Sequence, residues 1–128
     1  MSDPSRPPSR EEGAYELFRR GTGLLGSGDF GAATVSLERA RALEPDKSSI
    51  REALGRAYFS LGRFTAAAEE FAAIVDRHPV DDFALFCLGR SLEKSGRTQE
   101  ARPHLTLAAC LRPERADYRA YRDRLRAA

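Results

Sequence analysis

The residues able to support acid–base, nucleophilic or metal chemistry are few in this 128-residue chain. It has only two histidines, His78 and His104, and only two cysteines, Cys87 and Cys110. No Ser or Cys is spaced with a base and an orienting acid as in a nucleophilic triad. The cysteines give neither a disulfide framework nor a metal-ligand spacing, so we expect both to be buried, reduced thiols.

Two local patterns that resemble binding sites are better explained by helix ends and turns. His78 is followed closely by Asp81 and Asp82, but an exposed turn after a helix accounts for this cluster better than a metal site. The segment Gly21–Gly23 has neither the Lys-Ser/Thr ending nor the preceding strand of a phosphate-binding loop. We therefore expect no catalytic residue, no metal, no cofactor and no enzyme activity.

Composition excludes several other classes of protein. The 21 Lys and Arg nearly balance the 19 Asp and Glu, so no strong field favours nucleic acid or a membrane surface. No stretch approaches the roughly 20 apolar residues that span a bilayer. Residues 1–10 are rich in Ser, Pro and Arg and lack the apolar run of a secretory signal, so we expect a disordered tail and a cytoplasmic protein.

A 34-residue period organises the rest of the chain. Pro45, Pro79 and Pro113 lie 34 residues apart (79 − 45 and 113 − 79). Sets in the same register are Gly21, Gly55 and Gly89; Leu24, Tyr58 and Leu92; Gly28, Gly62 and Gly96; Ala33, Ala67 and Ala101; Leu37, Phe71 and Leu105; and Ala40, Ile74 and Ala108. Such periodicity is the signature of a repeat protein.

Each set has a physical role in a pair of helices. Apolar spacing such as Leu54, Tyr58 and Leu61 predicts a first helix in each unit, and a second apolar stripe predicts another helix after it. Small residues at matched positions let the two helices approach closely, while large ones fill the gap. Glycines such as Gly62 end the first helix, and prolines such as Pro79 prevent continuation of the second.

This pattern resembles the tetratricopeptide repeat family, whose unit is a 34-residue helix–turn–helix. We place the units at Ala14–Lys47, Ser48–Asp81 and Asp82–Arg115, within one domain over residues 11–128. The resemblance implies an all-α, right-handed solenoid. There are two departures from the pattern. The first helix of unit one is rich in glycine, so we expect its last turn to be loose, and Pro103 should distort the start of its helix.

After Pro113 the register changes, and residues 116–127 predict a capping helix. Tyr118, Tyr121 and Leu125 recur on one face of it, with arginines around them. The last hairpin of a solenoid exposes apolar surface unless something covers it. We expect these three side chains to cover that surface while the arginines face water.

The resemblance also implies where a partner binds, because the first helices of this family line a concave groove that holds a peptide or a partner helix. The helix phase gives the expected lining: Tyr15, Phe18, Thr22 and Leu25 in unit one; Ser49, Glu52, Arg56 and Phe59 in unit two; and Phe83, Phe86, Arg90 and Glu93 in unit three. The five aromatics among them would be partly exposed without a ligand.

We interpret this lining as the site of a protein–protein interaction module, an adaptor or scaffold. Burying one such aromatic fully yields roughly 1.5–3 kcal/mol. Arg56 and Arg90 stand one repeat apart and suit a carboxylate. The expected ligand is therefore an apolar segment of a protein that carries an acidic group.

Other interpretations stay open. Some aromatics belong to the core if the helix phase is wrong. Separately, the tail or the capping helix could fold into the groove and cover Phe18 and Phe59. The chain would alternatively be an assembly subunit that self-associates through the groove or a solenoid end. Nucleic acid is a weak third partner, because acids interrupt the arginines of the last helix.

Some family members clamp the C-terminal carboxylate of heat-shock chaperones with Lys and Asn on the first helices. The corresponding positions here are Phe18, Thr22, Ala53, Phe83 and Cys87, so we expect no such clamp.

Overall fold

The fold was analysed in a computed structural model that describes the backbone of residues 10–126 and the side chains of residues 13–126. Within this range the chain forms seven α-helices and no strand. The helices are α1 (Arg10–Gly26), α2 (Phe30–Leu43), α3 (Ser48–Ser60), α4 (Phe64–Arg77), α5 (Asp82–Lys94), α6 (Thr98–Leu111) and α7 (Ala116–Arg126). The predicted all-α solenoid is confirmed. None of the described helices is both long and apolar enough to cross a membrane.

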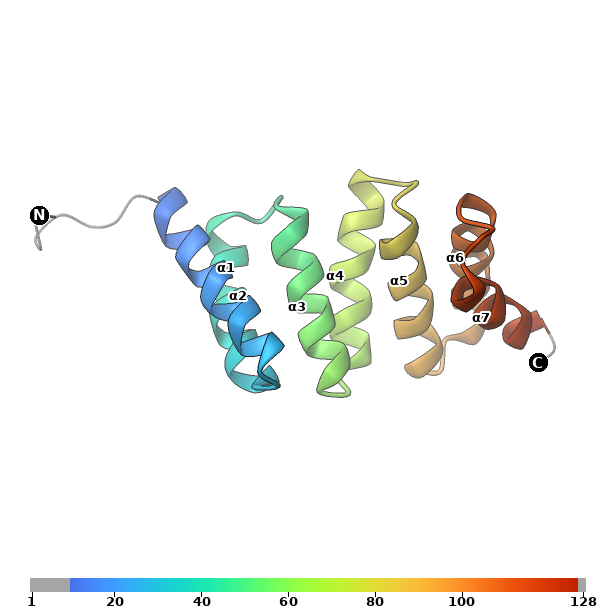
Figure 1. The fold of residues 1–128 in the computed structure, drawn as a ribbon, viewed down its shortest axis with the longest axis horizontal. Coiled ribbons are helices and arrows are strands. Elements are labelled where there is room, and N and C mark those ends of the chain that lie inside the picture. The colour runs from blue at the N-terminus through green and yellow to red at the C-terminus, as the bar shows by residue number, and fades with distance from the viewer. Residues whose placement is uncertain (1–9, 127–128) are drawn as a thin grey trace, which may run out of the picture.

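The helices stack in chain order into one elongated array (Figure 1). The two helices of each hairpin pack against each other: α1 against α2, α3 against α4, and α5 against α6. The second helix of each hairpin also packs against the next helix in the chain: α2 against α3, α4 against α5, and α6 against α7. The predicted division into three units and a tail stays a proposal. The tail lies outside the described residues except for Arg10, where α1 begins, four residues before the expected start of unit one.

Glycine ends each first helix as the sequence predicts. Gly28, Gly62 and Gly96 have φ values of 87°, 77° and 87°, in the left-handed region. At the first turn the amide of Asp29 donates to the carbonyl of Leu24 at 2.8 Å, and corresponding bonds recur at the other two turns. These bonds satisfy carbonyls that the helix end leaves without a partner, and they require a residue free to adopt positive φ.

A second set of glycines sets the distance between the helices of each hairpin. A Cβ added at Gly21 would lie 2.5 Å from the Leu37 side chain, and one at Gly89 would lie 2.5 Å from that of Leu105. Leu37 and Leu105 are fully buried. The first and second helices therefore approach to a distance that no larger residue at these positions permits without a shift.

An ion network joins the first two hairpins. The carboxylate of Glu70 on α4 accepts from Arg41 on α2 at 2.5 Å and from Arg51 on α3 at 3.0 Å. Arg51 also donates from Nε to the carbonyl of Pro45 at 2.8 Å. Glu70 is only 4% exposed, so its two cationic partners replace the water that burial removes.

The last helix caps the array. Tyr118 and Leu125 of α7 are buried, and Tyr121 is half-buried against the core. The Tyr118 hydroxyl donates to Asp82 on α5 at 2.8 Å, which fixes the position of α7 across the last hairpin. Neither expected irregularity ends a helix early, since α1 extends to Gly26 and α6 includes Pro103.

We predict opposite effects of alanine at two helical glycines. Gly89→Ala should lower the free energy of unfolding by about 1–3 kcal/mol, because its Cβ would overlap Leu105. Gly23→Ala is the matched control: nothing lies within 4 Å of its Cβ, and it should raise the free energy of unfolding by ~0.5–1 kcal/mol. Urea unfolding followed by circular dichroism measures both, and equal effects would contradict the proposed helix contact.

Candidate functional site

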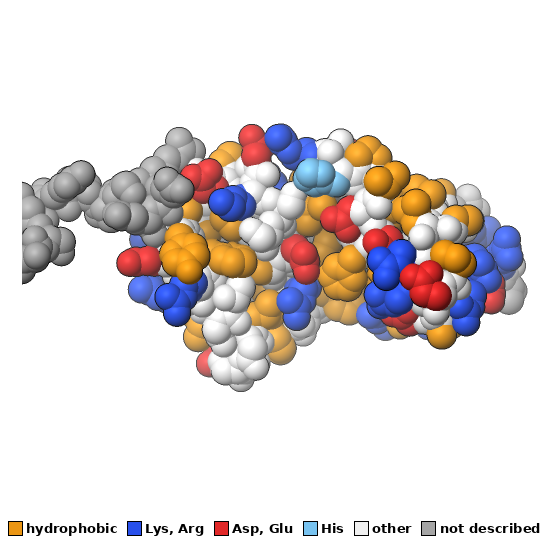
Figure 2. All heavy atoms as spheres, turned by 45° about the horizontal axis from the view of Figure 1, so that its top comes forward, with side chains coloured by type: hydrophobic (Ala, Val, Ile, Leu, Met, Phe, Trp, Pro, Cys, Tyr) orange, Lys and Arg blue, Asp and Glu red, His pale blue; other side chains and the backbone are white. Residues whose placement is uncertain are grey.

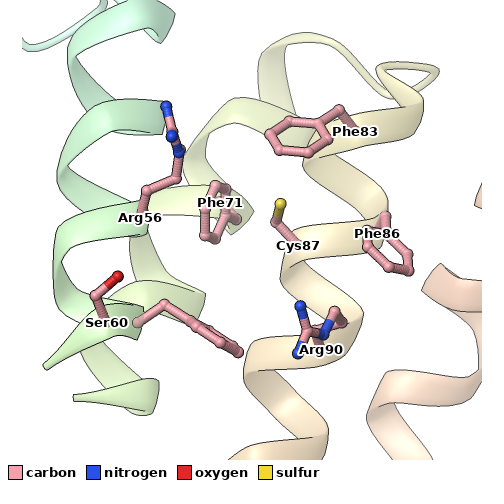
Figure 3. Close-up of a pocket in the computed structure, with 8 residues that line it drawn as sticks. Arg56, Ser60, Phe71, Phe83, Phe86, Cys87 and Arg90 are labelled. Atoms are coloured by element: carbon pink, nitrogen blue, oxygen red, sulfur yellow. The ribbon is translucent and has the colours of Figure 1, made fainter. Parts of the chain in front are cut away.

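A pocket of about 230 Å³ lies between the first helices α3 and α5. Its lining, which we call the groove pocket, is Arg56, Phe59 and Ser60 from α3, Phe71 from α4, and Phe83, Phe86, Cys87 and Arg90 from α5 (Figure 3). Four phenylalanines make it largely apolar, and two arginines add positive charge. The pocket thus combines an apolar interior with cationic groups, a composition typical of binding sites.

The floor of the groove pocket is made by a side chain from the second helix of unit two. Phe71 is 1% exposed and lies behind the pocket between α3 and α5 (Figure 3). Its ring fits because Gly55 lacks a side chain, since a Cβ there would be 2.8 Å from two ring carbons of Phe71. The close helix contact in this hairpin therefore also shapes the pocket.

Arg90 reaches from α5 into an aromatic cluster. Its guanidinium carbon lies 4.9 Å from the ring centre of Phe59, 4.7 Å from that of Tyr121 and 5.9 Å from that of Phe86. At these distances cation–π interactions hold the guanidinium in place without neutralising its charge. The buried Nε of Arg90 has no hydrogen-bond partner, so this side chain keeps an unused donor.

Arg56 and Arg90 are the cationic pair predicted from the sequence, and both line the groove pocket. Within residues 13–126 neither forms an ion pair, whereas the carboxylates of Glu70, Glu93 and Asp117 are each held by an arginine elsewhere. Arg56 is exposed and Arg90 is half-buried. The two guanidinium groups are thus available to a carboxylate from outside the chain.

The expected exposure of Phe86 is wrong. Phe86 is only 6% exposed, because α7 covers it: its ring centre lies 4.5 Å from that of Tyr118 and 5.3 Å from that of Tyr121. Coverage of the aromatics by the capping helix, which the sequence left open, therefore occurs at Phe86. Phe59 is half-buried instead by an edge-to-face contact with Phe64 at 5.0 Å.

Five of the twelve residues of the predicted lining border the groove pocket. Arg56, Phe59, Phe83, Phe86 and Arg90 border it. Unit one contributes nothing to it: Tyr15 is 62% exposed, and the other predicted side chains there are half-buried along α1, namely Phe18, Thr22 and Leu25. Glu52, Ser49 and Glu93 also lie outside its lining. The full predicted groove therefore stays a proposal.

Sequence reasoning missed three lining residues, Ser60, Phe71 and Cys87. Phe71 was assigned to the hairpin core, which is correct for its burial, but one side of its ring also faces the pocket. Cys87 stands one repeat after Ala53, at a position used by the family's carboxylate clamp, so the repeat register contained a signal for it. Ser60 lies one residue beyond the expected lining of α3 and had no such signal.

The two cysteines differ, so the expectation that both are buried is wrong. Cys110 on α6 is exposed, while Cys87 is half-buried in the groove pocket. Burial, with a further contribution from the negative charge of Glu52, raises the pKa of the Cys87 thiol to about 12. The pocket therefore presents a neutral thiol at physiological pH, which adds to its apolar character.

The arginines of α7 do not form an open cationic surface. Arg115, just before α7, pairs with Asp117 at 2.8 Å, and within the helix Arg122 pairs with Asp123 at 2.8 Å and Arg124 pairs with Glu93. Figure 2 shows blue and red side chains interleaved over the C-terminal end of the array. These pairs lower the local positive potential that attraction of phosphates would need.

Comparison with known proteins agrees with the repeat architecture. The tetratricopeptide repeat model matches residues 18–82 and residues 53–118. A stretch of 87 residues is 30% identical to Superkiller complex protein 3 of Mus musculus. This stretch is 68% of the chain but only 6% of the length of that protein.

Solved structures at low sequence identity share the fold. MamA from Desulfovibrio magneticus RS-1 superposes with a TM-score of 0.85 at 19% identity, covering 89% of this chain and 64% of that one. The Arabidopsis OM64 tetratricopeptide domain gives 0.84 at 18% identity, covering 93% and 98%. The first such domain of Spaghetti (RPAP3), bound to the HSP90 peptide SRMEEVD, gives 0.84 at 16% identity, covering 91% and 92%.

We predict that the two cysteines react at very different rates. At pH 8 iodoacetamide should modify Cys110 and leave Cys87 unmodified, because a thiol with a pKa of about 12 is ionised in only about one molecule in 10,000 at that pH. Mass spectrometry of the native chain counts the labels. In a Cys110→Ser variant the folded protein should remain unlabelled and the urea-unfolded protein should be labelled; rapid labelling while folded would contradict burial of the thiol.

Proposed function

The chain belongs to the tetratricopeptide repeat family, and from this premise we propose that it is a non-enzymatic module that binds a segment of another protein in the groove pocket. The ligand proposed is an apolar side chain with an acidic group nearby. The predicted adaptor role and cytoplasmic location are part of the same proposal.

One observation carries the proposal: two arginines without an acidic partner border one apolar pocket. Arg56 and Arg90 form no ion pair within the described part of the chain, and Phe71 lies between them, with Phe83 also lining the pocket (Figure 3). An apolar side chain in the pocket would gain about 1.5–3 kcal/mol on burial. A hydrogen bond from a guanidinium to a carboxylate contributes a further ~1.5–3 kcal/mol.

The size of the pocket favours a peptide side chain over a small-molecule ligand. A volume of about 230 Å³ is below the ~300–1,000 Å³ of typical small-molecule sites. Phe83 is 37% exposed at the pocket wall, so apolar surface remains for a side chain to bury. A single side chain in the pocket, with its backbone continuing along the first helices, fits this geometry.

We propose a different recognition mode from that of a chaperone carboxylate clamp. The peptide in the Spaghetti structure, SRMEEVD, carries three acidic side chains. The positions that hold Lys and Asn in clamp-forming members are occupied here by Phe18, Thr22, Ala53, Phe83 and Cys87. Without those donors, recognition of a terminal carboxylate loses its main contacts, so an internal acidic side chain reaching Arg56 or Arg90 is the ligand group we favour.

The ends of the array give less support to the alternative of self-association. On α1 the exposed Glu16 stands one repeat before Ile50, which is buried, and the exposed Gly23 stands one repeat before buried Ala57. At the other end α7 covers the last hairpin, and its Arg124 and Arg126 are exposed. At the ends of the array, polar residues or glycine thus stand where apolar side chains would be needed for another hairpin to stack. This makes self-association through an end of the array the less favoured alternative.

We predict that charge reversal at Arg56 removes ligand binding. A random-peptide display library selected on the native protein should enrich sequences with an aromatic or branched aliphatic residue near Asp or Glu. By fluorescence anisotropy, Arg56→Glu should weaken the best such peptide at least tenfold, because repulsion replaces attraction at the pocket rim. Arg39→Glu is the control, since Arg39 is exposed on α2 outside the groove pocket and changes the net charge equally.

Two results would refute this proposal. One is selection of peptides without acidic residues, or of peptides that Arg56→Glu binds as well as the native chain. The other is failure to select any peptide, together with a dimer in sedimentation that Arg56→Glu dissociates, which would make the pocket a self-association surface.

A second prediction concerns the chaperone peptide itself. SRMEEVD should bind at least tenfold more weakly than the peptide selected by display, because the clamp donors are missing. The same anisotropy assay measures both, and Spaghetti serves as the positive control for the peptide. Equal affinity would show that acidic character alone governs binding and that the apolar pocket is not used.

A further inference from the structure

Arg90 and Glu93 should pair on α5, but they do not. They are three residues apart, a spacing at which opposite charges on a helix face ordinarily attract. Instead, Glu93 accepts through Oε1 from the guanidinium of Arg124 on α7. The Nε of Arg90 and the Oε2 of Glu93 are both buried atoms without a hydrogen-bond partner. A donor and an acceptor three residues apart on α5 therefore both remain unused.

The capping helix contacts each of these two groups. Arg124 engages Glu93, whose side chain is only 18% exposed and therefore depends on a protein partner for its charge. Tyr121 of α7 contacts both cations, with its ring centre 4.7 Å from the guanidinium carbon of Arg90 and 4.5 Å from that of Arg124. The same ring therefore holds Arg90, which lines the groove pocket, and Arg124, which pairs with Glu93.

Unit two lacks a counterpart of Glu93. Arg56 is the counterpart of Arg90, and the residue three positions after it is Phe59, which has no charge. The acid of α3 is instead Glu52, four residues before Arg56. Unit three places Glu93 three residues after Arg90, and that carboxylate is held by Arg124.

We propose that Arg124 determines the specificity of the groove pocket for acidic ligands by holding Glu93 away from Arg90. The capping helix is then a working part of the binding site as well as a cover for the core. This inference rests on the proposed function, since it assumes a ligand with a carboxylate. It assigns Arg124 a positioning role, because the side chain acts on Arg90 through Glu93 without itself lining the pocket.

The test is a double-mutant cycle read with a matched pair of peptides. The probes are the acidic peptide selected by display on the native protein and its amide version, with Asp→Asn or Glu→Gln. Arg124→Ala should weaken the acidic peptide about five- to tenfold, because Glu93 then competes for Arg90, and should leave the amide peptide unchanged. Adding Glu93→Gln to Arg124→Ala should restore the native affinity for the acidic peptide.

Arg122→Ala is the control on the same helix, because Arg122 pairs with its neighbour Asp123 rather than with α5, and it should leave both affinities unchanged. Equal weakening of both peptides by Arg124→Ala, or no recovery in the double variant, would overturn the role of Arg124 and indicate a packing defect of α7. Failure of the native chain to select any acidic peptide would overturn the proposed function itself, so the two failures are distinguishable.

A measurement without ligand tests the same arrangement. In ¹⁵N-resolved spectra, Arg124→Ala should shift the Nε–Hε signal of Arg90 and slow its exchange with solvent, because Nε gains Glu93 as a partner. Glu93→Gln in the same background should diminish that change. An Arg90 signal that does not respond to Arg124→Ala would overturn the inference.

Discussion

The contact between a glycine of each first helix and a large apolar residue of its second helix is the constraint on which the rest of the structure depends. It sets the separation of the helices, since a Cβ at Gly55 would overlap the ring of Phe71. It also sets their rotation. Successive helical residues are about 100° apart, so with Gly55 against α4, the next residue, Arg56, is turned toward the groove pocket. Gly89 places Arg90 in the same way.

A nearly neutral protein obtains a charged site through selective pairing. Glu70 is held by Arg41 and Arg51 inside the array, and three arginines of α7, Arg122, Arg124 and Arg126, are held by nearby acids. Arg56 and Arg90 have no such partner within residues 13–126, so the positive charge that remains near the pocket is local. Because interactions between exposed charges are screened beyond about 10 Å, this local imbalance matters more for binding than the net charge.

The capping helix has two effects on the last hairpin that follow from the same side chains. Tyr118 is fully buried and bonded to Asp82, which removes apolar surface from water and fixes α7 in position. Tyr121 then lies against both Phe86 and Arg90. By covering Phe86, α7 removes one aromatic side chain from the surface that a ligand can contact. By stacking on Arg90, Tyr121 holds a cation at the edge of the groove pocket.

The sequence by itself determined the repeat, the helix ends and the hairpin contacts, because these follow local rules that recur every 34 residues: glycine at positive φ, proline after a helix, and small residues opposite large ones. It also determined that Arg56 and Arg90 share one side of the array. Other features follow from how the helices pack in space. The burial of Phe86, the pairing of Glu93 with Arg124 and the exposure of Cys110 depend on where α7 and α6 pack in space. Register predicts which residues are equivalent, but it does not predict which residues distant in the chain will cover or neutralise them.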